Sequence, residues 1–401
     1  MRPLDDLVVL DLTQFAAGPY GTQVLADAGA RVIKIEVPGT GDAYRHEGPR
    51  LPNGGPGDGT YFMRFSRSKE SVAIDLSRPG GRVAFEALVA RADVLVENLK
   101  PGSLARLGLG WERLRELNPR LVYATVTGFG HPDLLPSPLS GWPAFAIVAE
   151  AFGGVMDVIG DAGCRPHGSG VSAGDLVAGL DAMIGVLMAL HQRERTGRGQ
   201  RVDVAMADAM TSMNERSVFA YSATGEVPHR GFEGHLAPFG AFRARDGWVA
   251  IGVIGQPVWL RFCNAIGRPD LLDDPDLATG SARARHLDRL LPAIEEWLSQ
   301  RTKQEAAAEL AAANVPAAPI LDAREVSESP HVAARRMLVE FDYPGAGTFR
   351  SVASPVKLGE DLDPPVRRPP LLGEHTDAIL RELAGLDDET LVRLRTEGAI
   401  G

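Results

Sequence analysis

The first hundred residues alternate short apolar runs with helical patterns, and this alternation constrains the fold more than any other feature. An apolar run at Leu7–Leu12 is followed by a small-residue turn at Ala16–Pro19, a helical segment at Thr22–Ala28 and a second apolar run at Arg31–Val37. A strand, a turn, a helix and a strand within about 30 residues form a βαβ unit with parallel strands. The sequence therefore predicts an α/β fold. The turn lacks G-x-G-x-x-G, so the dinucleotide fingerprint is absent.

The same alternation continues further along the chain. Strands are expected at Ser71–Leu76, Asp93–Glu97 and Leu121–Val126, with a helix at Gly80–Ala92. Ligands of parallel sheets bind beyond the carboxyl ends of the strands, so the loops there are candidate binding segments. The loop at residues 38–59 is rich in Gly and Pro, and loops of that length in a compact domain are usually functional or mobile.

A Gly-, Ser- and Pro-rich loop runs into an apolar helix within Gly163–Ala189, and Asp175 stands at the junction. Asp is a preferred N-cap residue, and the helix dipole favours its ionised form at neutral pH. Small residues that allow another backbone to approach recur behind it, at Ala178, Gly179, Ala182, Gly185 and Ala189. Asp175 is either a helix cap or a nucleophile, and the stretch by itself favours the cap.

Length and charge narrow the class of protein. The 401 residues predict two domains, and the net charge of −10 argues against nucleic acid or an anionic membrane as a partner. The two cysteines, Cys164 and Cys263, fit neither a disulfide framework nor a metal site. Early acids argue against a signal peptide, and we expect no apolar run of membrane-spanning length. These features favour the cytoplasm.

Basic residues gather where loops meet the predicted strands, at Arg67, Lys69, Lys100 and Arg106. Such a group on an acidic protein suits a small molecule that carries phosphates. Solvated charge is the alternative, because Lys and Arg are common on every surface. Lys69 in particular is as readily interpreted as a lysine at a strand end that faces water.

Taken together, the chain resembles the family III coenzyme A transferases, a group that includes formyl-CoA and carnitine-CoA transferases and has α-methylacyl-CoA racemases as relatives. The matching blocks follow the family's order and cover nearly the whole chain. They include LDLTQFAAGPYG, SRSKESVAIDL, ADVLVENLKPGSLARLGLG, GSGVSAGDLVAGLDAMIGVLMAL, TGRGQRVDVAMADA and PPLLGEHT.

The resemblance implies a fold that periodicity does not give. It implies a large Rossmann-like domain with a parallel sheet at residues 1–210, and a smaller α+β domain at 225–325. A C-terminal segment at 330–401 would return to the large domain. Two chains would form an interlocked homodimer. The residues support this division weakly, through an expected hairpin turn at Phe242–Trp248 and an Ala-rich helix at Gln304–Ala313.

The resemblance also implies that Asp175 is the catalytic nucleophile, and that CoA passes from an acyl-CoA donor to a carboxylic acid, such as a small organic or dicarboxylic acid. It implies a set of CoA-contacting positions, with CoA and acyl-CoA as substrates, no tightly bound cofactor and no metal. These positions are Ala16, Ala17, Phe65, Ser66, Arg67, Ser68, Asn98, Leu99, Lys100, Arg106 and Phe145.

Departures from the family pattern define the alternatives. A racemase would use a His where this chain has Phe145 and a Glu where it has Gly255, so two residues for α-proton exchange are missing. The glycine run of oxalate-type enzymes reads RGFEGHLAP here, and Ala146 replaces a frequent acid. Intramolecular CoA transfer and a CoA-binding protein without activity also stay open.

Other polar residues have no assigned role or an open one. His131, His167 and His235 lack a carboxylate at a telling spacing, and we assign them no role. Three arginines are candidates to hold the free carboxylate of a dicarboxylic acyl group, namely Arg45, Arg64 and Arg165.

Overall fold

The computed structural model describes residues 2–49, 51, 59–228, 230, 236–360 and 365–401. Two compact units divide the chain. Unit 1 comprises residues 1–157, 167–224 and 335–401, and unit 2 comprises 158–166 and 225–334. The domain limits inferred from the resemblance stay a prediction. Parts of the 38–59 loop and of the RGFEGHLAP segment, with His235, lie outside the described residues.

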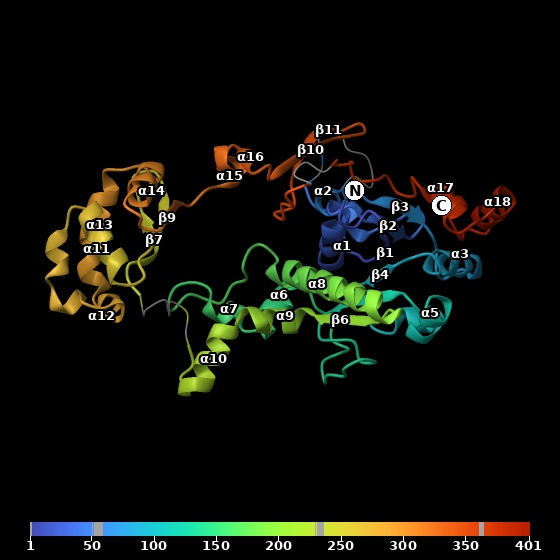
Figure 1. Ribbon diagram of the computed structural model, residues 1–401, viewed down its shortest axis with the longest axis horizontal. Coiled ribbons are helices and arrows are strands. Elements are labelled where there is room, and N and C mark those ends of the chain that lie inside the picture. Colours follow the sequence, from blue (N-terminus) through green and yellow to red (C-terminus); the bar gives the residue numbers. More distant parts are fainter. Residues whose placement is uncertain (1, 50, 52–58, 229, 231–235, 361–364) are drawn as a thin grey trace. The chain divides into compact units, whose positions relative to one another are not determined.

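A six-stranded parallel sheet forms the centre of unit 1 (Figure 1). Its strands are β1 (Val8–Leu12), β2 (Arg31–Glu36), β3 (Glu70–Ala73), β4 (Val94–Glu97), β5 (Val122–Thr127) and β6 (Arg201–Ala205). They lie in the order β3-β2-β1-β4-β5-β6, with Leu10 paired to Ile33 on one side and to Leu95 on the other. The predicted α/β fold with a parallel sheet is confirmed. The strand order reverses between β1 and β4, which is where such sheets bind ligands.

Helices connect and cover these strands. In the described part of unit 1 they are η1 (Ala43–His46), α1 (Ala17–Asp27), α2 (Thr60–Arg64), α3 (Pro79–Val89), α4 (Ser103–Arg106), α5 (Trp111–Leu117), α6 (Ala146–Phe152), α7 (Val155–Val158), α8 (Ala173–Thr196), α9 (Met206–Met213), α10 (Glu215–Thr224), α17 (Thr376–Glu382) and α18 (Asp388–Thr396). The first helix begins at Ala17 rather than at Thr22. Its first turn contains Pro19, which is tolerated there because the first amides of a helix have no intrahelical partner.

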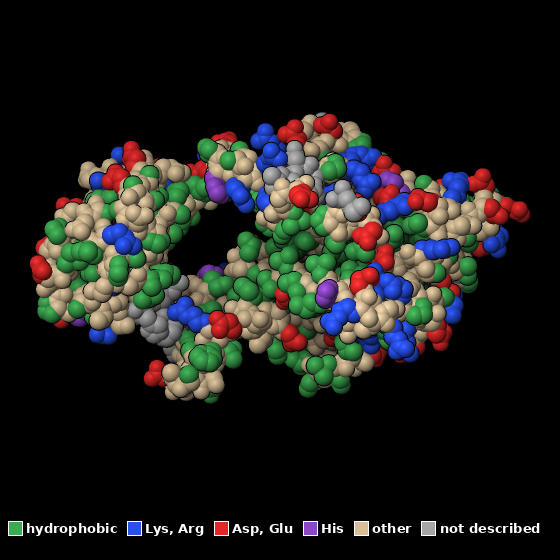
Figure 2. All heavy atoms as spheres, in the orientation of Figure 1, with side chains coloured by type: hydrophobic (Ala, Val, Ile, Leu, Met, Phe, Trp, Pro, Cys, Tyr) green, Lys and Arg blue, Asp and Glu red, His purple; other side chains and the backbone are tan. Residues whose placement is uncertain are grey.

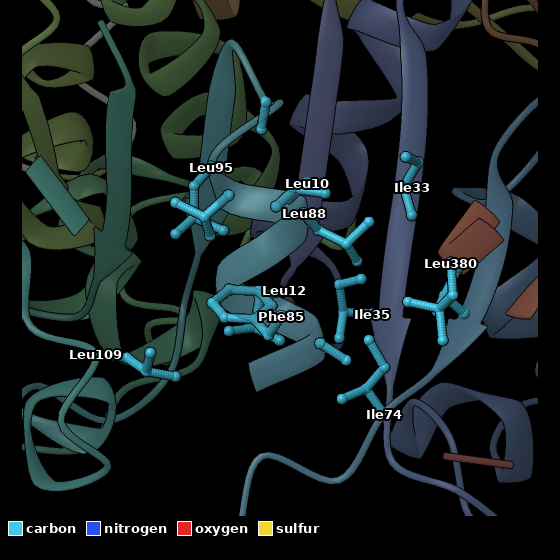
Figure 3. Close-up of a cluster of buried hydrophobic side chains, with 14 of the residues drawn as sticks. Leu10, Leu12, Ile33, Ile35, Ile74, Phe85, Leu88, Leu95, Leu109 and Leu380 are labelled. Carbon is cyan, nitrogen blue, oxygen red and sulfur yellow. The ribbon is translucent and has the colours of Figure 1, made fainter. Parts of the chain in front are cut away.

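One face of the sheet carries an aliphatic core (Figure 3). Leu10 and Leu12 of β1, together with Ile33 of β2, point toward Phe85 and Leu88 of α3. The helices α17 and α18 add Leu380, Leu391 and Leu394, and the following Ile400 forms a bridge with Ile74. The C-terminal segment therefore completes a core that begins with the first strand.

The opposite face is covered by α1 and α8, whose backbones pack very closely. A Cβ atom on Gly179 would lie 2.4 Å from the carbonyl oxygen of Ala17, and one on Gly21 would lie 2.7 Å from that of Gly179. The row of small residues in α8 thus allows the contact expected from sequence. Among the described helices, α8 alone has the length and apolar composition to cross a membrane, although we expected no such run. Of its most apolar window, 44% is buried within the protein.

Unit 2 contains an antiparallel sheet of β7 (Phe239–Arg243), β8 (Trp248–Gly252) and β9 (Ala317–Pro319). The expected turn joins β7 to β8. Its described helices are η2 (Pro269–Leu272), η3 (Pro275–Leu277), α11 (Gln256–Ala265), α12 (Gly280–Arg285), α13 (Leu287–Ser299), α14 (Lys303–Ala312), α15 (Ala323–Ser327) and α16 (Pro330–Ala334). A separate hairpin of β10 (Leu338–Tyr343) and β11 (Gly347–Val352) belongs to unit 1.

Candidate functional site

The loop between β1 and α1 is fixed at the point where the strand order reverses. Asn98, directly after β4, accepts a hydrogen bond from the Gln14 amide and donates one to the Gln14 carbonyl, both at 2.7 Å. The amide of Phe15 donates to Asp42 at 3.3 Å, and Phe15 has a φ of 64°, which a non-glycine residue rarely adopts. These contacts hold Phe15 in one orientation, with its ring partly exposed.

Beneath this loop lies a network of buried charges. Lys34 binds Asp42 at 2.9 Å and the Thr13 carbonyl at 2.7 Å, and Lys69 binds Asp11 at 2.8 Å. Burial alone would raise the pKa of Asp11, but Lys34 and Lys69 hold it well below its usual range. The Lys69 side chain is fully buried, so the interpretation of Lys69 as a lysine facing water is wrong.

Asp175 is the third residue of α8, and not its N-cap as expected; the N-cap position is Ser172, with a φ of 55°. Within the described chain, no hydrogen bond and no ion pair to its half-buried carboxylate is found. Burial raises the pKa of Asp175 to about 6, the nearby Glu150 carboxylate adds to the rise, and Arg64 opposes it. The pKa therefore moves in the direction opposite to that expected from the helix dipole, but the carboxylate is still mainly ionised at pH 7.

Glu150 holds the loop that leads into α8. Its buried carboxylate accepts hydrogen bonds from the Ser169 amide at 2.7 Å, from the Ser169 hydroxyl at 3.1 Å and from the Gly174 amide at 3.5 Å. A Cβ atom on Gly174 would lie 2.7 Å from the Ala146 carbonyl, so α6 packs directly on the first turn of α8. Sequence reasoning noted the missing acid at Ala146 and overlooked the acid one helical turn later.

Four aromatic side chains from separate segments form a connected row, which we call the aromatic rim: Phe145, Phe15, Tyr44 and Tyr61. Successive ring centroids are 5.9, 5.4 and 5.3 Å apart, in edge-to-face geometry. Tyr44 interacts electrostatically with Asp175; burial first and that carboxylate second raise its pKa. The aromatic rim therefore includes a side chain within electrostatic range of the Asp175 carboxylate.

Arg64 stands at the end of this rim. Its guanidinium lies over the Tyr61 ring at 5.1 Å and over the Phe65 ring at 4.5 Å. Arg64 is exposed, and in the part of the chain that the structure describes it makes no ion pair with a carboxylate. Of the other two arginine candidates, Arg45 is buried and bound to Glu36 at 2.7 Å, and Arg165 belongs to unit 2.

The predicted CoA-contacting positions fall into two environments. Those that are buried are Ala16, Ala17, Phe65, Ser66, Arg67 and Ser68. The Arg67 side chain forms a buried ion pair with Asp27, and the Ser68 amide donates to the Arg367 carbonyl at 2.9 Å. Arg67 and Lys69 are therefore already paired within the protein, and of the four basic residues singled out from sequence only Lys100 and Arg106 are exposed cations.

A cavity of about 190 Å³ adjoins the β1–α1 loop. Its wall includes Gln14, Leu76, Leu99 and Leu107. Leu99 and Leu107 both line the cavity. The exposed cations Lys100 and Arg106 lie between these two leucines in the sequence. The face of unit 1 in Figure 2 otherwise intersperses acidic and basic side chains.

Two of the three histidines considered in the sequence are described in the structure. His131 is buried, burial lowers its pKa, and its Nδ1 lies 3.0 Å from Arg201. His167 is exposed. The described residues contain no group of His, Cys, Asp and Glu side chains that could hold a metal ion.

The fold and the site together define an α/β protein with an unpaired carboxylate at the start of a helix, near the ligand-binding edge of a parallel sheet. The sequence profile of CoA-transferase family III matches residues 4–376, and the chain belongs to that family. The expected membership is thus confirmed, and the protein is a transferase enzyme.

Individual relatives agree with this assignment. The chain is 42% identical over 395 residues to a succinyl-CoA:mesaconate CoA-transferase of Haloarcula marismortui, covering 97% of this chain and 98% of that protein. It is 37% identical over 417 residues to a formyl-CoA:oxalate CoA-transferase of Streptomyces avermitilis, covering 100% of both. The crystal structure of a CaiB/BaiF family protein from Brucella suis superposes with a TM-score of 0.83 at 34% identity, covering 95% and 99% of the two chains.

Proposed function

We propose that the enzyme moves CoA from an acyl-CoA donor to a carboxylic acid, with Asp175 as the covalent nucleophile. The observation that carries the proposal is the Asp175 carboxylate, which is half-buried, without a partner in the described chain, and within electrostatic range of Tyr44 in the aromatic rim. A carboxylate left in this state costs folding free energy, and groups kept at such a cost cluster at functional sites. The relatives named for CoA transfer between succinate and mesaconate, and between formate and oxalate, support the same reaction class.

The chemistry proceeds in four balanced steps. The Asp175 carboxylate attacks the thioester carbonyl, which forms a mixed anhydride and expels CoA thiolate. The thiolate attacks the aspartyl carbonyl, which forms an aspartyl-CoA thioester and releases the donor acid as its carboxylate. The acceptor carboxylate attacks this thioester to form a second anhydride and expels the thiolate again. The thiolate then attacks the acceptor carbonyl, which yields the new acyl-CoA and restores Asp175.

The surroundings of Asp175 suit these steps. Burial and the charge of Glu150 raise the pKa of Asp175 to about 6, which makes the carboxylate a stronger nucleophile while it stays mainly ionised at neutral pH. Glu150 fixes the Ser169 and Gly174 amides, and so holds the backbone on which the nucleophile stands. Activation of one carboxylic acid at the expense of another is nearly energy-neutral, so the mechanism needs neither ATP nor a metal.

We assign CoA to the cavity and the loops around it. In this assignment Leu99 lines the pocket for the nucleotide end of CoA, and Asn98 holds Gln14, another residue of the pocket wall. Lys100 and Arg106 neutralise the phosphates of CoA. Phe145, as part of the aromatic rim, lines the path toward Asp175. The proposal includes a homodimer. It also includes a cytoplasmic location, because the thiols of Cys164 and Cys263 are free and the cytoplasm keeps thiols reduced.

The deciding experiment traps the covalent intermediate. The enzyme is given succinyl-CoA without an acceptor and is then treated with hydroxylamine or borohydride. Hydroxylamine should convert Asp175 to a hydroxamate, and borohydride should reduce the thioester form to an alcohol; peptide mass spectrometry locates both. Asp175→Asn should give neither product. If the α-proton of a chiral 2-methylacyl-CoA exchanges with deuterated water while no adduct forms, the enzyme is a racemase and the proposal fails.

A further inference from the structure

We propose that the guanidinium of Arg64 binds the distal carboxylate of a dicarboxylic acyl group, so that the enzyme selects dicarboxylic over monocarboxylic substrates. This inference rests on the proposed function, since it concerns the acyl group whose thioester reacts at Asp175. It assigns a role to one of three arginines that the sequence leaves equivalent.

The first argument is that Arg64 is held in place by aromatic rings but forms no ion pair with a carboxylate among the described residues. Its guanidinium lies over the rings of Tyr61 and Phe65, and Phe65 is itself held against Tyr20, with 5.4 Å between ring centroids. The N–H donors of a guanidinium lie on the edge of its plane, where they match the two oxygens of a carboxylate. By contrast, the equally planar Arg45 is stacked on Phe62 at 3.6 Å, and its donors are bound by Glu36.

The second argument is the position of Arg64 relative to the nucleophile. Arg64 and Asp175 interact electrostatically, yet they are too far apart to form an ion pair. Tyr44 interacts with both, and its ring adjoins Tyr61, over which Arg64 lies. A substrate with its reacting carbonyl at Asp175 therefore lies within electrostatic range of Arg64, which has no ion pair in the described part of the chain and stands apart from the reacting atoms.

The third argument concerns the free-energy cost of placing a monocarboxylic acyl group, rather than a dicarboxylic one, against Arg64. A monocarboxylic acyl chain would bring a methyl group toward Arg64 and would displace water from the guanidinium without replacing its hydrogen bonds. A second carboxylate replaces them with charge-assisted bonds, which are stronger than bonds between neutral groups. A site of this kind rejects the analogue that lacks the charged group more strongly than it rejects one that lacks a methylene.

The test compares succinyl-CoA with butyryl-CoA, two four-carbon donors that differ in the distal group. For wild-type enzyme, the second-order rate of hydroxylamine-trapped adduct formation should be higher with succinyl-CoA. Arg64→Gln should lower that rate roughly 10- to 100-fold for succinyl-CoA and change it little for butyryl-CoA. Arg64→Lys, which keeps the charge but loses the planar fork, should fall between wild type and Arg64→Gln. Arg115→Gln, at an exposed arginine of α5, is the matched control and should change neither rate.

A binding measurement separates this proposal from the mechanism. Calorimetry with Asp175→Asn, which cannot form the adduct, should give tighter binding of succinyl-CoA than of butyryl-CoA. The double variant with Arg64→Gln should lose that difference. An equal loss for both donors, or no loss for either, would overturn the role of Arg64. The absence of any adduct on wild-type enzyme would instead overturn the covalent mechanism, and the binding ratio would still decide whether Arg64 recognises the distal carboxylate.

Discussion

Two groups of charged side chains in unit 1 differ in whether they form ion pairs within the protein. Below the β1–α1 loop, the buried cations Lys34 and Lys69 each have a carboxylate within 2.9 Å. At the start of α8, Asp175 has no such partner in the described chain. Arg64 of α2 lies over two aromatic rings and forms no ion pair with a described carboxylate. Paired charges fix the shape of a loop, whereas unpaired ones are available to a substrate. The comparison predicts that the two groups respond differently to mutation.

The largest expected effect is on activity at the unpaired group. Asp175→Ala should abolish CoA transfer, because the nearby Glu150 carboxylate is already bound by the Ser169 and Gly174 amides. The pKa of Asp175 is raised in the folded protein, so the ionised carboxylate opposes folding above the pKa of about 4 that the unfolded chain has. Removing it should therefore leave the urea midpoint unchanged or slightly higher at pH 7. Residual transfer near the wild-type rate would refute the covalent mechanism.

Mutation of the paired group should lower the stability of the fold but leave the covalent chemistry intact. Lys69→Met removes one partner of a buried pair and leaves Asp11 with less compensation. Breaking such a pair costs about 3–5 kcal/mol, which equilibrium urea unfolding measures directly. The protein that remains folded should keep its nucleophile and form the covalent adduct. A stable Lys69→Met variant without adduct would mean that Lys69 takes part in the chemistry, and would erase the distinction between the groups.

Glu150 lies between the two extremes, since its carboxylate is buried and bound by amides but also acts on Asp175. Glu150→Gln keeps an acceptor for the Ser169 amide while it removes the charge. The pKa of Asp175 should then fall, so the acid limb of kcat/KM should move from near pH 6 to lower pH. The rate at neutral pH should fall several-fold, because a less basic carboxylate is a weaker nucleophile. Glu116→Gln, at an exposed acid of α5, should leave the pH profile in place.

The smallest effect is expected at the assigned phosphate contact. Arg106→Ala should raise the KM of every acyl-CoA donor by a similar factor, several-fold, with less change in kcat. Its exposed side chain would touch the part of CoA that is common to all donors and does not react, and loss of uniform binding appears mainly in KM. A fall in kcat that depends on the donor would place Arg106 at the acyl end instead.

The sequence predicts five of the six strands of the parallel sheet, because these are short apolar runs separated by clear turns, and it misses β6, whose residues alternate between polar and apolar. It also predicts that another backbone approaches the small residues of α8, but only the structure shows that this backbone belongs to α1. It fails where partners are distant in the chain. Lys69 is an isolated lysine in the sequence, and only the fold brings it to Asp11, 58 residues away.

The candidate site shows the same limit. Asp175 is found because a Gly-rich loop precedes an apolar helix, but its helical position is misjudged because Ser172 adopts a left-handed conformation that the sequence does not announce. Arg45 and Arg64 are equivalent in sequence, and only the location of Glu36 shows which of them is paired with it. The charge of Glu150 raises the pKa of Asp175 because α6 packs on α8. No local sequence pattern predicts this contact between the two helices.

The bridge between Ile74 and Ile400 has a consequence for protein synthesis. The first strands leave the ribosome early, but one side of their core is closed by α17 and α18, on the order of half a minute later at ~5–20 residues per second. During that interval the part of the core that α17 and α18 cover is still open, while unit 2, which consists mainly of the continuous residues 225–334, can already complete its own core. We therefore expect unit 1 of the nascent enzyme to become resistant to proteases only after α18 has emerged.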